Sequence, residues 1–145
     1  MPCEVIHGGE RAFYSLTDDK IRLPNFSDFK SGSAYYATRG HESVHWTGHA
    51  SRCNREFGKR FGDDAYAFEE LIAELGAAML SAVIGIDNEP RQDHAHYLKH
   101  WVQILKSDKK AIFAAASKSQ AAVDYLAGFD SVIEEEDEEI AALVA

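Results

Sequence analysis

The chain has 145 residues, 46% of them hydrophobic, and a formal net charge of −9. This length suits one domain with a single core. The sequence has no apolar run of about 18 residues, so no transmembrane helix is predicted, and its N-terminus lacks the basic and apolar regions of a secretory signal peptide. Cys3 and Cys53 alone are too few for a disulfide scaffold. We therefore expect a cytoplasmic protein.

The negative charge is concentrated near the C-terminus. Residues 134–139 read EEEDEE and contribute −6 of the −9, which leaves −3 for the rest. An acidic domain without a basic stripe is a poor ligand for a polyanion, so we expect no direct nucleic-acid binding by this chain alone. We assign residues 1–130 to the folded domain. Residues 131–145 are expected to form a solvated, partly disordered acidic tail, with docking onto a partner as the alternative.

Three short segments near the N-terminus are typical of strands. Residues 3–7 precede the turn-forming pair Gly8-Gly9, and residues 11–14 follow it. Residues 20–23 alternate polar and apolar side chains, the pattern of a half-buried strand, and Pro24 ends them. These segments predict a small antiparallel sheet.

The rest of the chain is typical of helices, which we predict over residues 34–50 (ending near Gly48), 64–86, 93–106 and 108–126, with Gly128 as the final stop. The second helix is the clearest, because apolar residues recur at the spacing of a buried face: Phe68, Leu71, Ile72, Leu75, Met79, Val83 and Ile86. In the third helix we expect four residues to face inward: Leu98, Trp101, Val102 and Leu105. Strands followed by helices predict an α+β fold, a small sheet packed on about four helices.

The most informative stretch is His41-Glu42-Ser43-Val44-His45, an H-E-x-x-H motif. On a helix, residues i and i+4 lie on one face, so the imidazoles of His41 and His45 can reach one metal ion together. Glu42 is turned about 100° from His41 and can touch a metal-bound water without ligating the metal. The motif therefore predicts a catalytic zinc site, which needs a third protein ligand and one open position.

His49 is one candidate for the third ligand, since it lies one turn beyond His45. Three collinear helical histidines spread over about 12 Å of helix axis, which bonds of about 2.1 Å to one ion cannot span unless the helix breaks. A histidine at a helix end is the more ordinary interpretation. The longer motif H-E-x-x-H-x-x-G-x-x-H matches through Gly48 but ends at Ser51, which disfavours a third histidine.

Glu70 and Glu74, four residues apart on the helix predicted over 64–86, are the other candidates. The neighbours of Glu70 on a helical wheel are mostly small, which lets another helix approach closely: Tyr66, Ala67, Ala73, Glu74, Ala77, Ala78 and Ser81. Buried carboxylates need cations or hydrogen-bond donors. We predict Glu70 as the third ligand and Glu74 as the acceptor of the outer ring N–H of a ligand histidine. The alternatives are Glu74 on the metal, or a metal-free buried glutamate paired with Arg52 or Arg55.

This combination, H-E-x-x-H followed by E-x-x-A-E at Glu70, Ala73 and Glu74, resembles the gluzincin metallopeptidases, in which a helical glutamate completes the zinc site. Longer blocks resemble the C-terminal metallopeptidase-like domain of ArdC-type antirestriction proteins: DDKIRLPNF, TRGHESVHWTGHASR, FGDDAYAFEELIAELGAAML and DHAHYLKHWVQILKSDKKAIFAAASKSQAAVDYL. The resemblance covers about residues 8–126. In that family the domain usually follows a single-stranded-DNA-binding domain. We find no such segment in this sequence. We therefore expect this chain to be an excised domain or a stand-alone relative, and we do not carry over DNA binding to it.

A zinc site of this type implies a peptidase acting on a protein or peptide. Glu42 is expected to take the proton of the attacking water and deliver it to the leaving amine. His94 and Tyr97 are candidates for stabilising the oxyanion, with Tyr66 as a weaker one; for His94, a core histidine with one hydrogen bond is the alternative. The resemblance also suggests residues 20–23 as a strand edge for an extended substrate.

Three functions are compatible with these observations. The first, which we favour, is a zinc-dependent metallopeptidase of the gluzincin type. The second is an antirestriction or protein-binding module in which the zinc site is structural or vestigial. The third is a helical interaction domain without a metal, because each motif alone is short. Zinc retained after dialysis would exclude the third.

Overall fold

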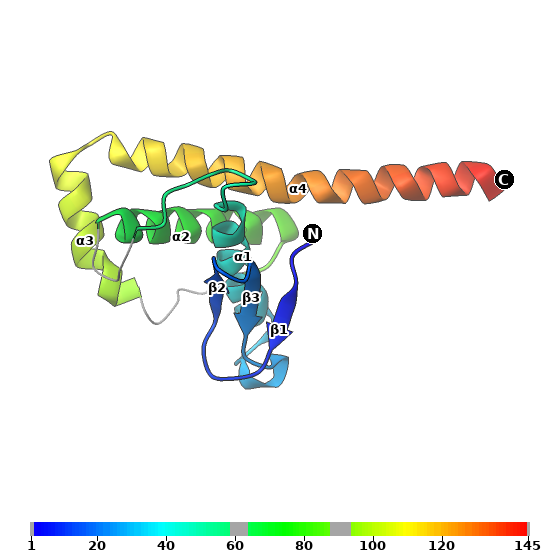
Figure 1. Cartoon of the computed structure of the whole chain (residues 1–145), viewed down its shortest axis with the longest axis horizontal. Coiled ribbons are helices and arrows are strands. Elements are labelled where there is room, and N and C mark those ends of the chain that lie inside the picture. The colour runs from blue at the N-terminus through cyan, green and yellow to red at the C-terminus, as the bar shows by residue number, and fades with distance from the viewer. Residues whose placement is uncertain (1, 59–63, 88–93, 145) are drawn as a thin grey trace.

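The computed structural model describes the backbone of residues 2–58, 64–87 and 94–144, and side chains through residue 58, over 64–87 and over 97–128. Three strands come first: β1 (Val5–His7), β2 (Phe13–Ser15) and β3 (Lys20–Leu23). A short 3-10 helix (Phe26–Asp28) leads into four α-helices: α1 (Gly32–Thr47), α2 (Asp64–Ile84), α3 (His94–Ser107) and α4 (Ala111–Val144) (Figure 1). The predicted α+β class, a small sheet with four helices, is confirmed.

The sheet is mixed and not antiparallel throughout. Its strand order is β1-β3-β2, with β1 parallel to β3 and β2 antiparallel to it. The antiparallel prediction is wrong for β1, because the chain after Gly8 leads β2 to the far side of β3 and does not fold it back beside β1. The central strand is therefore β3, whose Ile21 and Leu23 are fully buried.

Helix α1 lies between the sheet and α2. Its N-terminal cap is Ser31, whose Oγ accepts a hydrogen bond from the Ala34 amide at 3.0 Å. On the sheet side, α1 contributes Tyr35 and Trp46 to a buried cluster with residues of β3. On the other side, Val44 packs in a second cluster with side chains of α2 and α4: Leu71, Ile72, Ala73, Ala115 and Ala122.

The contact between α1 and α2 is close because of a glycine. A Cβ placed on Gly76 would lie 2.7 Å from Val44 Cγ2, so a larger residue there has to displace its neighbour. Ala73 and Ala77 on the same helix are also buried. The face of small residues predicted around Glu70 is thus confirmed as a surface that another helix approaches.

Helices α3 and α4 depart from the prediction in two ways. Leu98 and Val102, expected to face inward, are 58% and 41% exposed, because α3 contacts the body through the side that carries Trp101, whose Nε1 donates to the Ala67 carbonyl at 2.8 Å. Helix α4 does not stop at Gly128 but continues to Val144. One glycine costs a helix only about 1 kcal/mol. In Figure 1 the C-terminal part of α4 extends beyond the rest of the molecule.

Helix α2 ends at Ile84, before the predicted bound of residue 86, because Gly85 adopts a left-handed φ of 72°. Val83, expected in its buried face, is exposed. Among the described residues, no helix combines the length and apolar content needed to cross a bilayer. The domain boundary at residue 130 and the role of the acidic run stay predictions.

Candidate metal centre

Two imidazoles of α1 meet at their Nε2 atoms. These atoms of His41 and His45 are 3.1 Å apart, in keeping with residues that are four apart on one helix face. Both side chains are buried, with residue exposures of 1% and 7%. Two ring nitrogens held this close, away from bulk water, favour a cation between them.

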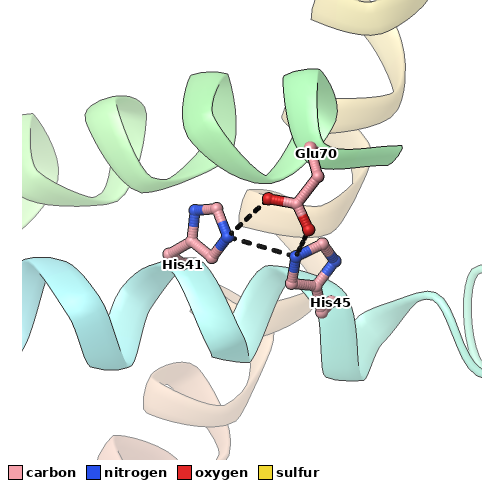
Figure 2. Close-up of side chains that lie close together, drawn as sticks. All are labelled: His41, His45 and Glu70. Atoms are coloured by element: carbon pink, nitrogen blue, oxygen red, sulfur yellow. Dashed lines mark hydrogen bonds and ion pairs between the residues drawn. The ribbon is translucent and has the colours of Figure 1, made fainter. Parts of the chain in front are cut away.

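A carboxylate of α2 completes the cluster. Glu70 Oε1 lies 3.1 Å from His45 Nε2, and Glu70 Oε2 lies 3.3 Å from His41 Nε2 (Figure 2). Ligand atoms of a tetrahedral ion with bonds of about 2.1 Å lie roughly 3.4 Å apart, which is close to these separations. The three side chains therefore fit a divalent metal ion.

The charges around the histidines favour a positive charge at this point. Burial alone would lower the pKa of His45, but hydrogen bonds to Glu69 and Glu70, together with their charges, raise it to about 10. Burial alone would raise the pKa of Glu70, but His41 and His45 hold it well below its ordinary value. A metal cation bound by the same atoms would supply this positive charge in place of a proton.

The second ring nitrogen of each histidine also faces a carboxylate of α2. His45 Nδ1 lies 3.1 Å from Glu69 Oε1, and His41 Nδ1 lies 3.2 Å from Glu74 Oε1. The structure thus brings Glu74 beside a histidine, where the sequence prediction has it. The contact of Glu69 with His45 is a hydrogen bond, and a carboxylate bonded in this way can hold a ring in the tautomer that leaves Nε2 available to a metal.

Sequence reasoning missed Glu69, which is 2% exposed. A signal was available, because a helical wheel centred on Glu69 also carries small and apolar neighbours: Ala65, Ile72, Ala73 and Gly76.

Arg55 donates to both carboxylate oxygens of Glu69, at 2.9 and 2.8 Å. Arg52 pairs with Asp19. Among the described contacts, Glu70 meets the two histidines and neither arginine, which does not match the metal-free alternative.

His49 does not join the cluster. Helix α1 ends at Thr47 with Gly48 as its C-cap, and the His49 ring lies beyond that end, with Nδ1 2.8 Å from Ser51 Oγ. In the part of the chain that the structure describes, the group able to hold a metal consists of three residues whose ligand atoms lie within 4.8 Å of one another: His41, His45 and Glu70.

These side chains line a pocket of about 340 Å³ that Glu42 also lines. Glu42 is 3% exposed. Tyr66 and Tyr97 form another part of the wall; they are hydrogen-bonded to each other, and their rings stack with centroids 6.1 Å apart. The structure therefore places Glu42 and Tyr97 in the wall of the same pocket as the two histidines, and their catalytic roles stay predictions. The side chain of His94 lies outside the described residues.

The strand beside this pocket is β2 and not β3. Residues 11–14 and Leu16 line the pocket, whereas β3 is paired on both sides. The prediction that residues 20–23 offer an edge to a substrate is therefore wrong, because both edges of that strand are already hydrogen-bonded.

The fold and its His/His/Glu cluster define a zincin-like metal site. Residues 1–118 match the family described as zincin-like metallopeptidase, and the chain belongs to this family. Two crystal structures of the antirestriction protein ArdC from plasmid R388 are similar to it. The Mn(II)-bound form matches 88% of this chain at 42% identity with a TM-score of 0.79, and the metal-free form matches 86% at 45% identity with a TM-score of 0.75. The resemblance to ArdC-type proteins is confirmed.

Two relatives known from sequence are similar over most of the chain. Uncharacterized protein y4eC of Sinorhizobium fredii is 42% identical over 123 residues, and DNA primase TraC of Escherichia coli is 41% identical over 122 residues. The chain covers 40% of y4eC, 8% of TraC and 48% of the Mn(II)-bound ArdC chain. It thus spans less than half the length of each.

The identity of the metal follows from the donor set and the family. One of the two similar ArdC structures is the Mn(II)-bound form, which supports a divalent ion in this fold. Two imidazoles and one carboxylate are a donor set of catalytic zinc sites, in which the fourth coordination position stays open for water or substrate. Together these observations support a divalent metal here, with zinc as the ion that the donors favour.

Proposed function

We propose that the chain is a zinc-dependent metallopeptidase domain that hydrolyses peptide bonds. The observation that carries this proposal is the meeting of His41, His45 and Glu70 on the wall of a pocket that Glu42 also lines. We assign the first three as metal ligands and Glu74 as the residue that orients His41. Three protein ligands leave the open position that a catalytic site requires.

Glu42 supplies the base in this proposal. Zinc, when bound, supplies a Lewis acid that polarises a carbonyl and acidifies a water. Glu42 follows His41 in the sequence, so its carboxylate lines the pocket without belonging to the ligand set. It takes up the proton of the attacking water and delivers it to the leaving amine.

Tyr97 supplies the hydroxyl that stabilises the oxyanion. Its ring stacks on Trp101 with centroids 5.9 Å apart, and Trp101 is anchored to the carbonyl of Ala67. Tyr66 is the hydrogen-bond partner of Tyr97. Burial raises the pKa of Tyr66, against the opposing effect of this hydrogen bond, so Tyr66 keeps its proton at neutral pH. His94, three residues before Tyr97, is the second candidate for this role.

The substrate is a protein or peptide in extended form. Strand β2 pairs with β3 on one side, and residues 11–14 line the pocket, so a peptide can add to the sheet there. Phe13, Leu16 and Phe57 give this wall an apolar character, which favours an apolar substrate side chain.

We extend to this domain the antirestriction role for which the ArdC protein is named. The identity of 42% and the TM-score of 0.79 support this extension. A cytoplasmic location is part of the proposal, in keeping with the two free cysteines Cys3 and Cys53. The folded part of the chain carries a net charge of only −3 once the acidic run 134–139 is set aside, and its sequence has no basic stripe, so we favour a protein over a nucleic acid as the ligand of this domain.

The decisive variant is Glu42→Gln, with the exposed, remote Glu4→Gln as its matched control. Zinc-loaded protein is incubated with a quenched-fluorescence peptide library, and zinc content is measured in parallel. We expect Glu42→Gln to lower cleavage by about 10²-fold or more with its zinc content unchanged, and Glu4→Gln to behave as the parent. Undiminished cleavage by Glu42→Gln would falsify the assigned role. If the zinc-loaded parent cleaves no member of the library, the proposal that the domain is a peptidase is contradicted.

A further inference from the structure

Arg55 reaches from the segment after α1 to both helices of the metal centre. The guanidinium is buried, with its residue 8% exposed. On the α2 side it donates from Nε and Nη2 to the two carboxylate oxygens of Glu69. On the α1 side it donates from Nη2 to the Val44 carbonyl at 2.6 Å and from Nη1 to Thr47 Oγ1 at 2.9 Å. One side chain therefore ties the helix that carries the histidines to the helix that carries Glu70.

The local sequence builds this arrangement. Asn54 adopts a positive φ of 48°, which turns the chain, and the Arg55 amide donates to the Gly48 carbonyl at 2.9 Å. A Cβ on Gly48 would lie 2.9 Å from Arg55 Nη2 and 2.6 Å from Phe57 Cζ, so the glycine leaves the space that the guanidinium needs. A positive charge at the C-terminal end of α1 also interacts favourably with the helix dipole.

Glu69 connects Arg55 to a histidine of the metal centre. Its Oε1 accepts from Arg55 Nη2 and lies 3.1 Å from His45 Nδ1. A carboxylate can only accept, so the hydrogen of the neutral ring is on Nδ1. The Nε2 lone pair of His45 then points toward Glu70, 3.1 Å away. Because Arg55 holds both oxygens of Glu69, the carboxylate cannot rotate away from the ring.

We propose that Arg55 is a positioning residue of the metal centre, which acts through Glu69 to fix the orientation and tautomer of His45 and so sets the affinity for zinc. The proposal rests on the proposed function in taking His41, His45 and Glu70 as the ligands. A buried arginine that only stabilises the fold would have no such specific effect on metal binding.

Arg52 is the matched control, because its side chain has comparable contacts but, among the described residues, none with His41 or His45. It donates from Nε to the Trp46 carbonyl at 2.6 Å, pairs with Asp19, and lies over the Trp46 ring at 4.0 Å. Lysine keeps the charge at either position but lacks the rigid, two-point donor geometry. Arg55→Lys and Arg52→Lys therefore remove the same geometry at two places.

The test measures zinc affinity by competition with a chromophoric chelator at fixed pH, with the cobalt(II) absorption spectrum as a second readout. We expect Arg55→Lys and Glu69→Gln each to weaken zinc binding about 10- to 100-fold and to change the cobalt spectrum. The double variant should bind no more weakly than Glu69→Gln alone, since Arg55 acts through Glu69. Arg52→Lys should keep the affinity and the spectrum of the parent.

Three results would overturn the proposal: a folded Arg55→Lys with parental affinity, equal weakening by Arg55→Lys and Arg52→Lys, or additive effects in the double variant. Should Arg55→Lys fail to fold by circular dichroism, Glu69→Gln decides alone, and parental affinity in that variant overturns it. A parent that binds no zinc contradicts the proposed function itself. A parent that binds zinc with unaffected variants contradicts only the role of Arg55.

Discussion

Two arginines, three residues apart in the segment after α1, extend toward different parts of the molecule. Both cap carbonyls of the last turns of α1, Arg52 at Trp46 and Arg55 at Val44. Arg52 then reaches the turn between β2 and β3, where the side chain of its partner Asp19 is 40% exposed. Arg55 reaches α2, where the side chain of its partner Glu69 is 3% exposed. An ion pair open to water is screened and weak, whereas breaking a buried one leaves an uncompensated charge. Loss of the Arg52–Asp19 pair and loss of the Arg55–Glu69 pair should therefore change different properties of the protein.

The largest effect is expected on the α2 side, from removal of the proposed ligand Glu70. Glu70→Ala leaves the two imidazoles without the carboxylate ligand. Loss of a residue that only hydrogen-bonds to a ligand lowers metal affinity by up to roughly 100-fold, and we expect the loss of Glu70 to lower zinc affinity by more than that. Elemental analysis after dialysis measures this. Asp19→Ala, the change on the other side of the comparison, should keep the zinc content of the parent. Full zinc retention by Glu70→Ala would rule out its role as a ligand.

The next largest effect concerns the contact that brings α2 to α1. Gly76→Ala places a methyl group against Val44, and overpacking of this kind costs about 1–3 kcal/mol. Chemical denaturation measures the loss of stability. Gly128→Ala on α4 is the matched control, because a Cβ there meets nothing within 4 Å among the described residues, and it should stabilise the helix by up to about 1 kcal/mol. A Gly76→Ala protein as stable as the parent would refute the close contact.

A smaller loss of stability is expected from a change at Arg52, on the side of the sheet. Arg52→Met removes the Asp19 pair and the stacking over Trp46, and we expect a loss of about 1–2 kcal/mol in unfolding free energy. Zinc affinity should stay at the parental value, because none of the described contacts of the Arg52 side chain reaches His41 or His45. A drop in zinc affinity in this variant would remove the distinction between the two arginines.

The smallest effect is a dependence of stability on pH. The hydrogen bond with Arg52 lowers the pKa of Asp19 below 3.8, more than the opposing effect of burial. A depressed carboxyl pKa stabilises the fold above the unfolded value and loses that contribution as the pH falls through the folded one. Because the carboxylate is partly exposed, we expect less than about 1 kcal/mol. Asp19→Asn should flatten the decline in stability below about pH 4, measured by denaturation across a pH series; an unchanged decline would argue against this pair.

The sequence was informative where the signal is local. His41 and His45 lie four apart on a helix, so their convergence follows from helix geometry alone. Glu70 could be chosen because its neighbours on the wheel are small. Arg55 and Glu69 are 14 residues apart on different elements, and no local pattern predicts that they pair.

The errors in the predicted fold have the same origin. The parallel pairing of β1 with β3 depends on the path of residues 8–12, and strand composition does not encode it. The amphipathic pattern of α3 identifies a face with Leu98 and Val102 but does not say whether another element covers that face. The pairing of β1 and the burial of the α3 face are both decided by tertiary contacts, which helix and strand periodicity do not report.

The ligand set draws two donors from α1 and one from α2, at a place where the helices touch through Gly76. An ion held from both helices acts as a removable cross-link between them. It binds the folded chain and has no preformed site in the unfolded one, so free zinc at 100 times its dissociation constant would add about 2.7 kcal/mol to the folding free energy. The melting temperature of this domain would then report the zinc concentration around it, and chelation alone would bring the chain closer to unfolding.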